Sequence, residues 1–284
     1  MSDIFPRLVA TDWLADHLGE PGLVVLDASR HLPAANRDPR TEYQAGHIPG
    51  ARFLDLASLT DALSPIPAAL PSAAQLAERL GDLGVAPRDR IVIYDDSAVK
   101  TAARGWFTLV AHEIEHVAIL DGGLTKWRAE RRPLESGTPA FARTAAATLP
   151  AARNVRCKSE ILAILAGQSE QLLDARSADR VFGSGIDPVH GGQNGRIPGS
   201  LNLPFGNLYN DDGTFRSPAE LRAAFGAAGL DLARPIVTTC GSGVTACVLL
   251  FALGLVGARD TALYDGSWQE WEADPETPKA QGPE

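Results

Sequence analysis

Cysteine, aromatic residues and positive charge are all scarce in this chain of 284 residues. Its three cysteines, Cys157, Cys240 and Cys247, are odd in number and lack the spacing of metal ligands, which favours free thiols over a disulfide framework. Lysine and arginine total 26 against 35 acidic residues, so the formal net charge is -9 and nucleic acid is not expected as a partner. No apolar run reaches the roughly 18 residues that span a bilayer, and the charged N-terminus lacks a signal-peptide pattern. We therefore expect a cytoplasmic protein without a membrane partner.

The chain repeats itself. Asp27 is followed further on by EYQAGHIPGA, and Asp174 in the second half is followed by GGQNGRIPGS. The first-half segments IVIYDD and LDGGLTKW likewise match IVTTCG and YDGSWQEW. The repeat predicts two copies of one domain, at 1–134 and 155–284, joined by a linker at 135–154. The polar, proline-rich residues from Pro275 onward are expected to form a loose tail.

Short apolar runs alternate with longer helical patterns in both halves. Runs such as LVVLDA and PIVTTC read as buried strands, and segments such as SAAQLAERLGDLG and VTACVLLFALGLVG read as helices. This alternation predicts an α/β fold in which each domain is a parallel sheet flanked by helices on both faces. Ligands bind such sheets at the carboxyl ends of the strands.

A cysteine stands at one of these strand ends. It opens a loop that precedes a helix and comprises Cys240, Gly241, Ser242, Gly243, Val244 and Thr245. The two glycines let the backbone curl, so that N–H groups at the helix start can point at an anion such as a thiolate or a persulfide. The hydroxyls of Ser242 and Thr245 are expected to add hydrogen bonds to the same charge. The first half has Asp95 and Asp96 at the matching place, so we predict a catalytic second domain and a degenerate first domain.

With these segments the sequence resembles the tandem rhodanese family over nearly its whole length. The matching signatures are GHIPGA at 46–51, RIPGS at 196–200, CGSGVT at 240–245 and the DG-x-x-x-W segments at Asp121 and Asp265. CGSGVT is similar to the active loop of the 3-mercaptopyruvate sulfurtransferase branch. The resemblance implies that Cys240 takes sulfur from a small anionic donor as a persulfide, and passes it to a thiol, cyanide or a thioredoxin-like acceptor. No cofactor beyond that persulfide is expected.

The resemblance also implies a donor-binding arginine, Arg180, whereas Arg176 is expected to form a structural ion pair. The family's second anion-binding arginine is missing, so His190 or Arg196 would have to substitute for it. Ala68 stands where the branch has a first-domain histidine. These departures leave open whether the donor is 3-mercaptopyruvate or thiosulfate, and a non-catalytic persulfide carrier or binding scaffold remains a further alternative.

Three other patterns compete with this interpretation. The loop also fits Gly-x-Gly-x-x-Ala with Asp265 after the next strand, as in dinucleotide sites, but Asp121 repeats that acid where no such loop exists. A cysteine phosphatase needs an arginine where Ala246 stands. The string His112-Glu113-Ile114-Glu115-His116 resembles a zinc motif, but a helix end that favours cationic residues explains it better, so no metal site is predicted.

Overall fold

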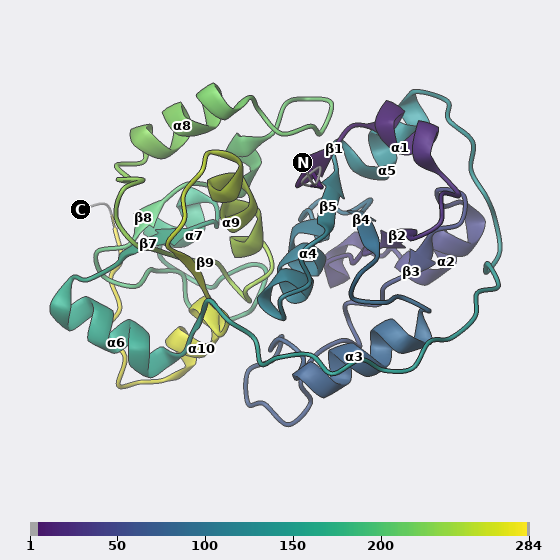
Figure 1. The fold of residues 1–284 in the computed structure, drawn as a ribbon. Helices are drawn as coiled ribbons and strands as arrows, with labels where there is room; N and C mark the ends of the chain where they lie inside the picture. Colours follow the sequence, from purple (N-terminus) through teal and green to yellow (C-terminus); the bar gives the residue numbers. More distant parts are fainter. Residues whose placement is uncertain (1–4, 283–284) are drawn as a thin grey trace. The chain divides into compact units, whose positions relative to one another are not determined.

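Two five-stranded parallel sheets organise residues 5–282, the part of the chain that the computed structural model describes (Figure 1). The strand order is β1-β5-β4-β2-β3 in the first sheet and β6-β10-β9-β7-β8 in the second. Each strand of the second sheet thus takes the place of its counterpart in the first, and helices flank both sheets. The predicted α/β fold with two similar domains is confirmed.

The first sheet and its helices come from the first half of the chain. In chain order the elements are β1 (Leu8–Val9), α1 (Thr11–His17), β2 (Leu23–Asp27), η1 (Pro33–Ala35), α2 (Pro39–Ala45), β3 (Arg52–Phe53), α3 (Ala73–Asp82), β4 (Arg90–Tyr94), α4 (Ala102–Ala111), β5 (Val117–Leu120) and α5 (Gly123–Ala129).

The second half repeats this order. Its elements are β6 (Val155–Arg156), α6 (Lys158–Gly167), β7 (Gln171–Asp174), α7 (Ala178–Phe182), β8 (Leu201–Asn202), η2 (Phe205–Leu208), α8 (Pro218–Ala227), β9 (Ile236–Thr239), α9 (Ala246–Leu255), β10 (Thr261–Tyr264) and α10 (Ser267–Ala273). No helix within residues 5–282 is both long and apolar enough to cross a membrane.

Matching residues start matching helices. Both α3 and α8 begin at a capping box, in which the hydroxyl of Ser72 or Ser217 accepts a hydrogen bond from the backbone N–H three residues on. The two repeated tryptophans anchor the cores in the same way: Trp127 and Trp271 are both fully buried. Each indole N–H donates over 2.8 Å to a proline carbonyl six or seven residues further along. The repeated DG-x-x-x-W segments therefore give both units a buried tryptophan with the same hydrogen bond.

The two compact units exchange one segment each. The first unit comprises residues up to 61, 70–153 and also 210–215, and the second comprises 62–69, 154–209 and 216 onward. Within the first unit, the backbone N–H of Phe215 donates to Asp121 over 2.8 Å, and Asp212 forms an ion pair with Lys126. The exchanged segments follow β3 and β8, which are equivalent strands.

The predicted linker and tail are both tied to the units by backbone hydrogen bonds. Residues 135–153 belong to the first unit, where Glu135 pairs with His47, and the N–H of Thr144 donates to the carbonyl of Gly81. Within residues 275–282 the tail is not loose, so that expectation was wrong for this segment. Ala280 pairs with Arg196, and the hydroxyl of Thr277 donates to the carbonyl of Trp271.

Candidate active site

The Cys240 loop joins the end of β9 to the start of α9. All four residues of β9 are buried, and Cys240, the next residue, is only 2% exposed. Gly243 has φ +76°, a left-handed conformation that a glycine adopts at little cost, and it turns the chain toward the helix. Ser242 and Thr245 are half-buried in this loop, and Val244 is 9% exposed. The predicted arrangement of strand, thiol, curled loop and helix is confirmed.

The start of α10 holds the loop in place. The hydroxyl of Ser267 accepts a hydrogen bond from the backbone N–H of Cys240 over 3.2 Å. The backbone N–H groups of Trp268 and Gln269 donate to the carbonyls of Cys240 and Gly241 over 3.0 and 2.9 Å. These contacts use the backbone of residues 240 and 241, so they fix the loop without occupying the Cys240 thiol.

Asp95 holds the position of Cys240 in the first unit. Asp27 pairs with Tyr94 in one sheet and Asp174 pairs with Thr239 in the other, so Asp95 and Cys240 both stand one residue beyond equivalent strand ends. The Asp95 carboxylate accepts hydrogen bonds from the N–H of Ala102, the first residue of α4, over 2.6 Å, and from that of Ser97 over 2.9 Å. Burial raises the pKa of Asp95 to about 6, although these N–H groups favour its ionised form.

The backbone after Asp95 therefore presents N–H groups to an acidic side chain at the start of a helix. The second unit has the same junction, with Ala246 at the start of α9 and Cys240 in the place of the acid. A thiolate or persulfide at Cys240 would face the same kind of donors. The loop of the second unit is one residue shorter, because Thr245 and Thr101 are the two helix N-caps.

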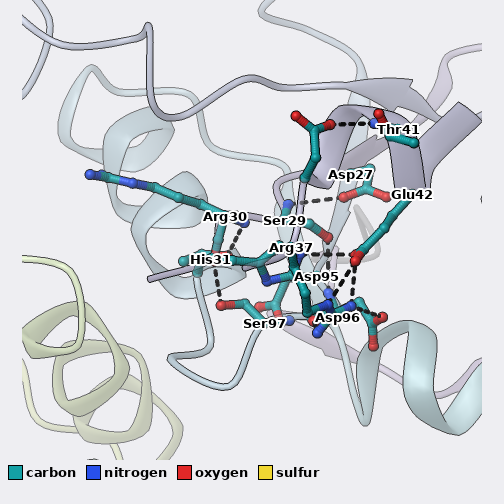
Figure 2. A network of polar contacts seen from close by, with 12 residues as sticks. Asp27, Ser29, Arg30, His31, Arg37, Thr41, Glu42, Asp95, Asp96 and Ser97 are labelled. Atoms are coloured by element: carbon teal, nitrogen blue, oxygen red, sulfur yellow. Dashed lines mark hydrogen bonds and ion pairs between the residues drawn. The ribbon is translucent and has the colours of Figure 1, made fainter. Parts of the chain in front are cut away.

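The next residue of the first-unit loop, Asp96, is held by ion pairs (Figure 2). Asp96, the counterpart of Gly241, pairs with Arg37 over 2.8 Å and with Arg128 over 3.0 Å. Arg37 also binds Glu42, which contacts His31 over 3.0 Å. These contacts connect α2, α5 and the β4–α4 loop. The first-unit loop thus carries a carboxylate where the second unit has Cys240, followed by an acid held in a polar network.

His190 and Arg180 converge on Gly241 in the second unit. A Cβ atom built on Gly241 would lie 2.1 Å from Nε2 of His190 and 3.1 Å from Nη2 of Arg180. The first distance is far shorter than any real contact, so residue 241 has to be glycine where His190 lies as it does. Two side chains that bear N–H donors thus lie against the backbone of the residue next to Cys240. Such a pair suits an anion.

Asp187 holds Arg180 in this position. Its carboxylate accepts from Nη2 of Arg180 over 2.7 Å and from Nε over 3.1 Å. The same carboxylate accepts from the backbone N–H groups of Val189 and His190 over 2.8 and 3.3 Å. Burial favours the neutral acid, but these hydrogen bonds outweigh it and hold the pKa of Asp187 below its usual range.

Arg176 forms the predicted structural ion pair. Its guanidinium donates to Asp174 over 2.6 Å, and both side chains are almost fully buried. The guanidinium carbon of Arg176 lies 4.8 Å from the ring centroid of Trp268, the residue whose N–H binds the carbonyl of Cys240. Arg176 therefore packs against the residue whose backbone binds the Cys240 loop.

Arg196, the other candidate for the second donor-binding residue, contacts the C-terminal segment and α7. Its Nη1 donates to the carbonyl of Gly282, and its guanidinium carbon lies 5.0 Å from the ring centroid of Phe182. The residue is only 3% exposed. Arg196 thus joins the C-terminal segment to α7, and His190 is the residue found beside Arg180.

The zinc-like string does not form a helical metal motif. Helix α4 ends at Ala111, so His112 is its C-cap and His116 lies beyond the helix, next to β5. Nδ1 of His112 contacts the carbonyl of Pro150 over 2.7 Å. Among residues 5–282 no three acidic, histidine or cysteine side chains are grouped to hold a metal ion. A helix end bound to the linker explains the string.

The fold and this site define an α/β enzyme of two repeated domains, in which one domain carries a cysteine at a strand end, in the loop that leads into a helix. The family model for the rhodanese-like domain matches residues 10–130 and 158–274. The chain belongs to the rhodanese-like family, and its similarity to curated relatives over nearly its whole length shows that it is a sulfurtransferase.

Curated relatives of two kinds cover the whole chain. The chain is 38% identical to the 3-mercaptopyruvate sulfurtransferase of Rattus norvegicus over 98% of this chain and 97% of that protein. It is 40% identical to the human enzyme of the same name, over 93% and 91%. It is also 38% identical to the thiosulfate sulfurtransferase of Cricetulus griseus, over 98% and 97%. Overall identity therefore does not select the donor.

Solved structures agree with the assignment. The crystal structure of SseA from Escherichia coli, described as a 3-mercaptopyruvate sulfotransferase with a rhodanese fold, aligns with a TM-score of 0.83 at 35% identity. The alignment covers 92% of this chain and 98% of SseA. The Tum1 protein of Saccharomyces cerevisiae aligns with a TM-score of 0.89 at 25% identity, over 98% and 99%.

Two residues of the site had no role in the sequence interpretation. Ser267 belongs to the repeated DG-x-x-x-W segment at Asp265, and Asp187 lies between Arg180 and His190. An acid seven residues beyond an expected anion-binding arginine is a signal that could have singled out Asp187. Ser267 follows Asp265 and Gly266 in a strand-to-helix turn. This sequence pattern does not predict that its hydroxyl binds the backbone of Cys240.

Proposed function

We propose that the protein transfers a sulfur atom from 3-mercaptopyruvate to a thiol or cyanide through a persulfide on Cys240. The observation that supports this most is the pair of side chains, Arg180 and His190, that lies against Gly241 beside the buried thiol. A carboxylate-bearing donor bound there would have its thiol sulfur next to Cys240. The acceptor would be a small thiol, cyanide or a thioredoxin-like protein.

In the first half-reaction the Cys240 thiolate attacks the thiol sulfur of the donor. A new S–S bond forms and the donor's C–S bond breaks, and its electron pair goes to the carbon as the enolate of pyruvate. The enolate takes a proton, whose source is the donor's own S–H, and leaves as pyruvate. Ser242, which is half-buried in the loop, would help to pass this proton. Backbone N–H groups at the start of α9 would stabilise the persulfide anion.

In the second half-reaction an acceptor thiolate or cyanide attacks the outer sulfur of the persulfide. The S–S bond breaks, its electron pair returns to Cys240 as the thiolate, and the product is a persulfide of the acceptor or thiocyanate. Because Cys240 is only 2% exposed, the outer sulfur is the atom that an acceptor reaches more easily. No further cofactor enters either step.

Thiosulfate is the second candidate donor, because relatives named thiosulfate sulfurtransferase are as similar as the others. The loop argues for the first: residues 241–245 are uncharged, and His190 leaves no room for a side chain at position 241. A persulfide carrier or scaffold without turnover is a third possibility. The three free thiols suit a reducing compartment, for which we propose the cytoplasm.

The direct test compares the purified protein with Cys240→Ser, using 3-mercaptopyruvate and thiosulfate in parallel and dithiothreitol or cyanide as acceptor. We expect turnover that requires Cys240, with a larger kcat/KM for 3-mercaptopyruvate. A preference for thiosulfate would overturn the assigned donor. The absence of turnover with both donors would favour the carrier or scaffold.

A further inference from the structure

A carboxylate lies where an anion-binding site would be expected to avoid one. Asp187 is 1% exposed, and it forms a two-pronged ion pair with Arg180, which contacts the glycine next to the nucleophile. Its negative charge cancels much of the charge that Arg180 offers to an anionic donor. Charge alone would make this acid a disadvantage, so its presence calls for another explanation.

Asp187 organises both arms of the pair that faces Gly241. One oxygen accepts from Nη2 of Arg180, and the other accepts from the backbone N–H groups of Val189 and His190. The backbone of Asp187 closes the same turn, because its carbonyl accepts from Gly191 over 2.9 Å. The loop that carries His190 is thus wrapped around the carboxylate that orients Arg180.

Arg176 limits the freedom of this carboxylate from the other side. Its Nη1 lies 3.9 Å from Oδ2 of Asp187, is buried, and has no hydrogen-bond partner within the described residues. Asp187 therefore lies between two guanidinium groups, one fixed on Asp174 and the other directed at Gly241. A carboxylate that is held on several sides fixes the orientation of the Arg180 guanidinium that it binds.

We propose that Asp187 is a positioning residue for donor recognition: it sets Arg180 and His190 in the geometry that receives the donor's carboxylate beside Cys240. This inference rests on the proposed function for the identity of the donor. Its physical content is a balance of two effects. Fixing the side chains of Arg180 and His190 favours binding of 3-mercaptopyruvate more than the negative charge of Asp187 opposes it.

Asp187→Asn distinguishes a positioning role from a purely electrostatic role, because the two roles predict opposite changes in the KM for 3-mercaptopyruvate. Asp187→Asn removes a negative charge, so electrostatics alone would lower the KM for 3-mercaptopyruvate. If Asp187 acts by positioning, KM rises by roughly tenfold or more, since small displacements of binding groups are costly. The change in kcat is expected to be the smaller one. A lowered or unchanged KM would overturn the proposal.

Asp179→Asn is the matched control. Asp179 is an exposed acid on α7, immediately before Arg180, so its removal deletes the same charge near the same arginine without touching the ion pair of Arg180 with Asp187. We expect its KM to stay within about twofold of wild type. A rise in KM equal to that of Asp187→Asn would show that the effect is not specific to the carboxylate that binds Arg180, and would overturn the proposal.

A second variant covers the case in which Asp187→Asn does not fold. Asp187→Glu keeps the charge but moves the carboxylate by one methylene group, so a positioning role predicts a raised KM and a purely electrostatic role predicts none. An unchanged KM in Asp187→Glu would contradict the proposal. Thermal denaturation of each variant reports how much of any loss comes from folding.

Alkylation of Cys240 gives a readout that needs no sulfur donor. The thiolate displaces iodide from iodoacetate, which carries a carboxylate, or from neutral iodoacetamide, and peptide mass spectrometry follows Cys240 apart from the exposed Cys157. We expect the ratio of the iodoacetate rate to the iodoacetamide rate to fall severalfold in Asp187→Asn and to persist in Asp179→Asn. Equal changes in both rates would indicate a structural role only. This ratio tests Asp187 even if neither sulfur donor reacts.

Discussion

Asp95 and Cys240 occupy one position in the two halves of the chain, one residue beyond equivalent strands and before equivalent helices. In the first half a carboxylate accepts hydrogen bonds from the loop, and in the second half a thiol stands in its place. The first half thus shows, with its own side chain, that this junction offers N–H groups to an acidic group.

The first prediction concerns Asp95 and pH. Its pKa is raised from 3.8 to about 6 in the folded protein, so the folded state binds the proton more tightly than the unfolded chain. The stabilisation from this group is therefore complete at acidic pH and is lost as pH rises toward 6. The unfolding free energy should fall by about 3 kcal/mol over this range in wild type relative to Asp95→Asn. Chemical denaturation between pH 4 and 7 measures the difference.

The control for that comparison is Asp16→Asn, which changes an exposed acid on α1. Its stability should run parallel to that of wild type across the same pH range. Parallel curves for wild type and Asp95→Asn would mean that folding does not raise the pKa of Asp95, which would contradict this prediction.

The second prediction concerns the fit of His190 against Gly241. In Gly241→Ala the new methyl group meets Nε2 of His190, so we expect a loss of about 1–3 kcal/mol in stability and a raised KM for the donor. Gly226→Ala adds the same methyl group to α8 in open space and should be neutral or stabilising. The double variant Gly241→Ala/His190→Ala should regain stability but not donor affinity. Thermal denaturation and steady-state kinetics distinguish these effects, and a double variant no more stable than Gly241→Ala would refute the steric account.

The third prediction separates His190 from Arg196. His190→Gln should raise the KM for 3-mercaptopyruvate roughly tenfold, as expected for the loss of a charge-assisted hydrogen bond, with little change in stability. Arg196→Gln should do the reverse, because Arg196 binds the carbonyl of Gly282 and packs on Phe182. A loss of about 1–3 kcal/mol at unchanged KM is expected. A raised KM in Arg196→Gln alone would restore it as the donor-binding residue.

The parts of the structure that sequence predicts well are those with a local or repeated signal. The apolar runs that became β4 and β9, the capping box at Ser72 and the turn glycine Gly243 each report on their own few residues. The internal repeat then places Cys240 at a strand end, because the two halves have to share a topology. The ion pair of Arg176 was predictable from a local signal, because Asp174 lies only two residues away.

Contacts between distant segments were beyond such reasoning. Arg196 looks like any arginine near an expected anion site, and only the docking of the tail, through Ala280 and Gly282, shows what it binds. The segments 62–69 and 210–215, which the units exchange, have no sequence periodicity that predicts the exchange. Asp187 acquires its role from a loop that folds back around its own carboxylate, which depends on three-dimensional packing.

Mass spectrometry of Cys240 tests the central claim most directly. The protein is treated with 3-mercaptopyruvate without an acceptor, digested without reductant, and compared with Cys240→Ser and with a sample to which cyanide is then added. The account predicts that fragment ions of the peptide holding both Cys240 and Cys247 place the mass of one added sulfur atom on Cys240, that the peptide containing Cys157 gains none, and that cyanide removes the added mass. Turnover without added sulfur on Cys240, or turnover that survives in Cys240→Ser, would contradict it.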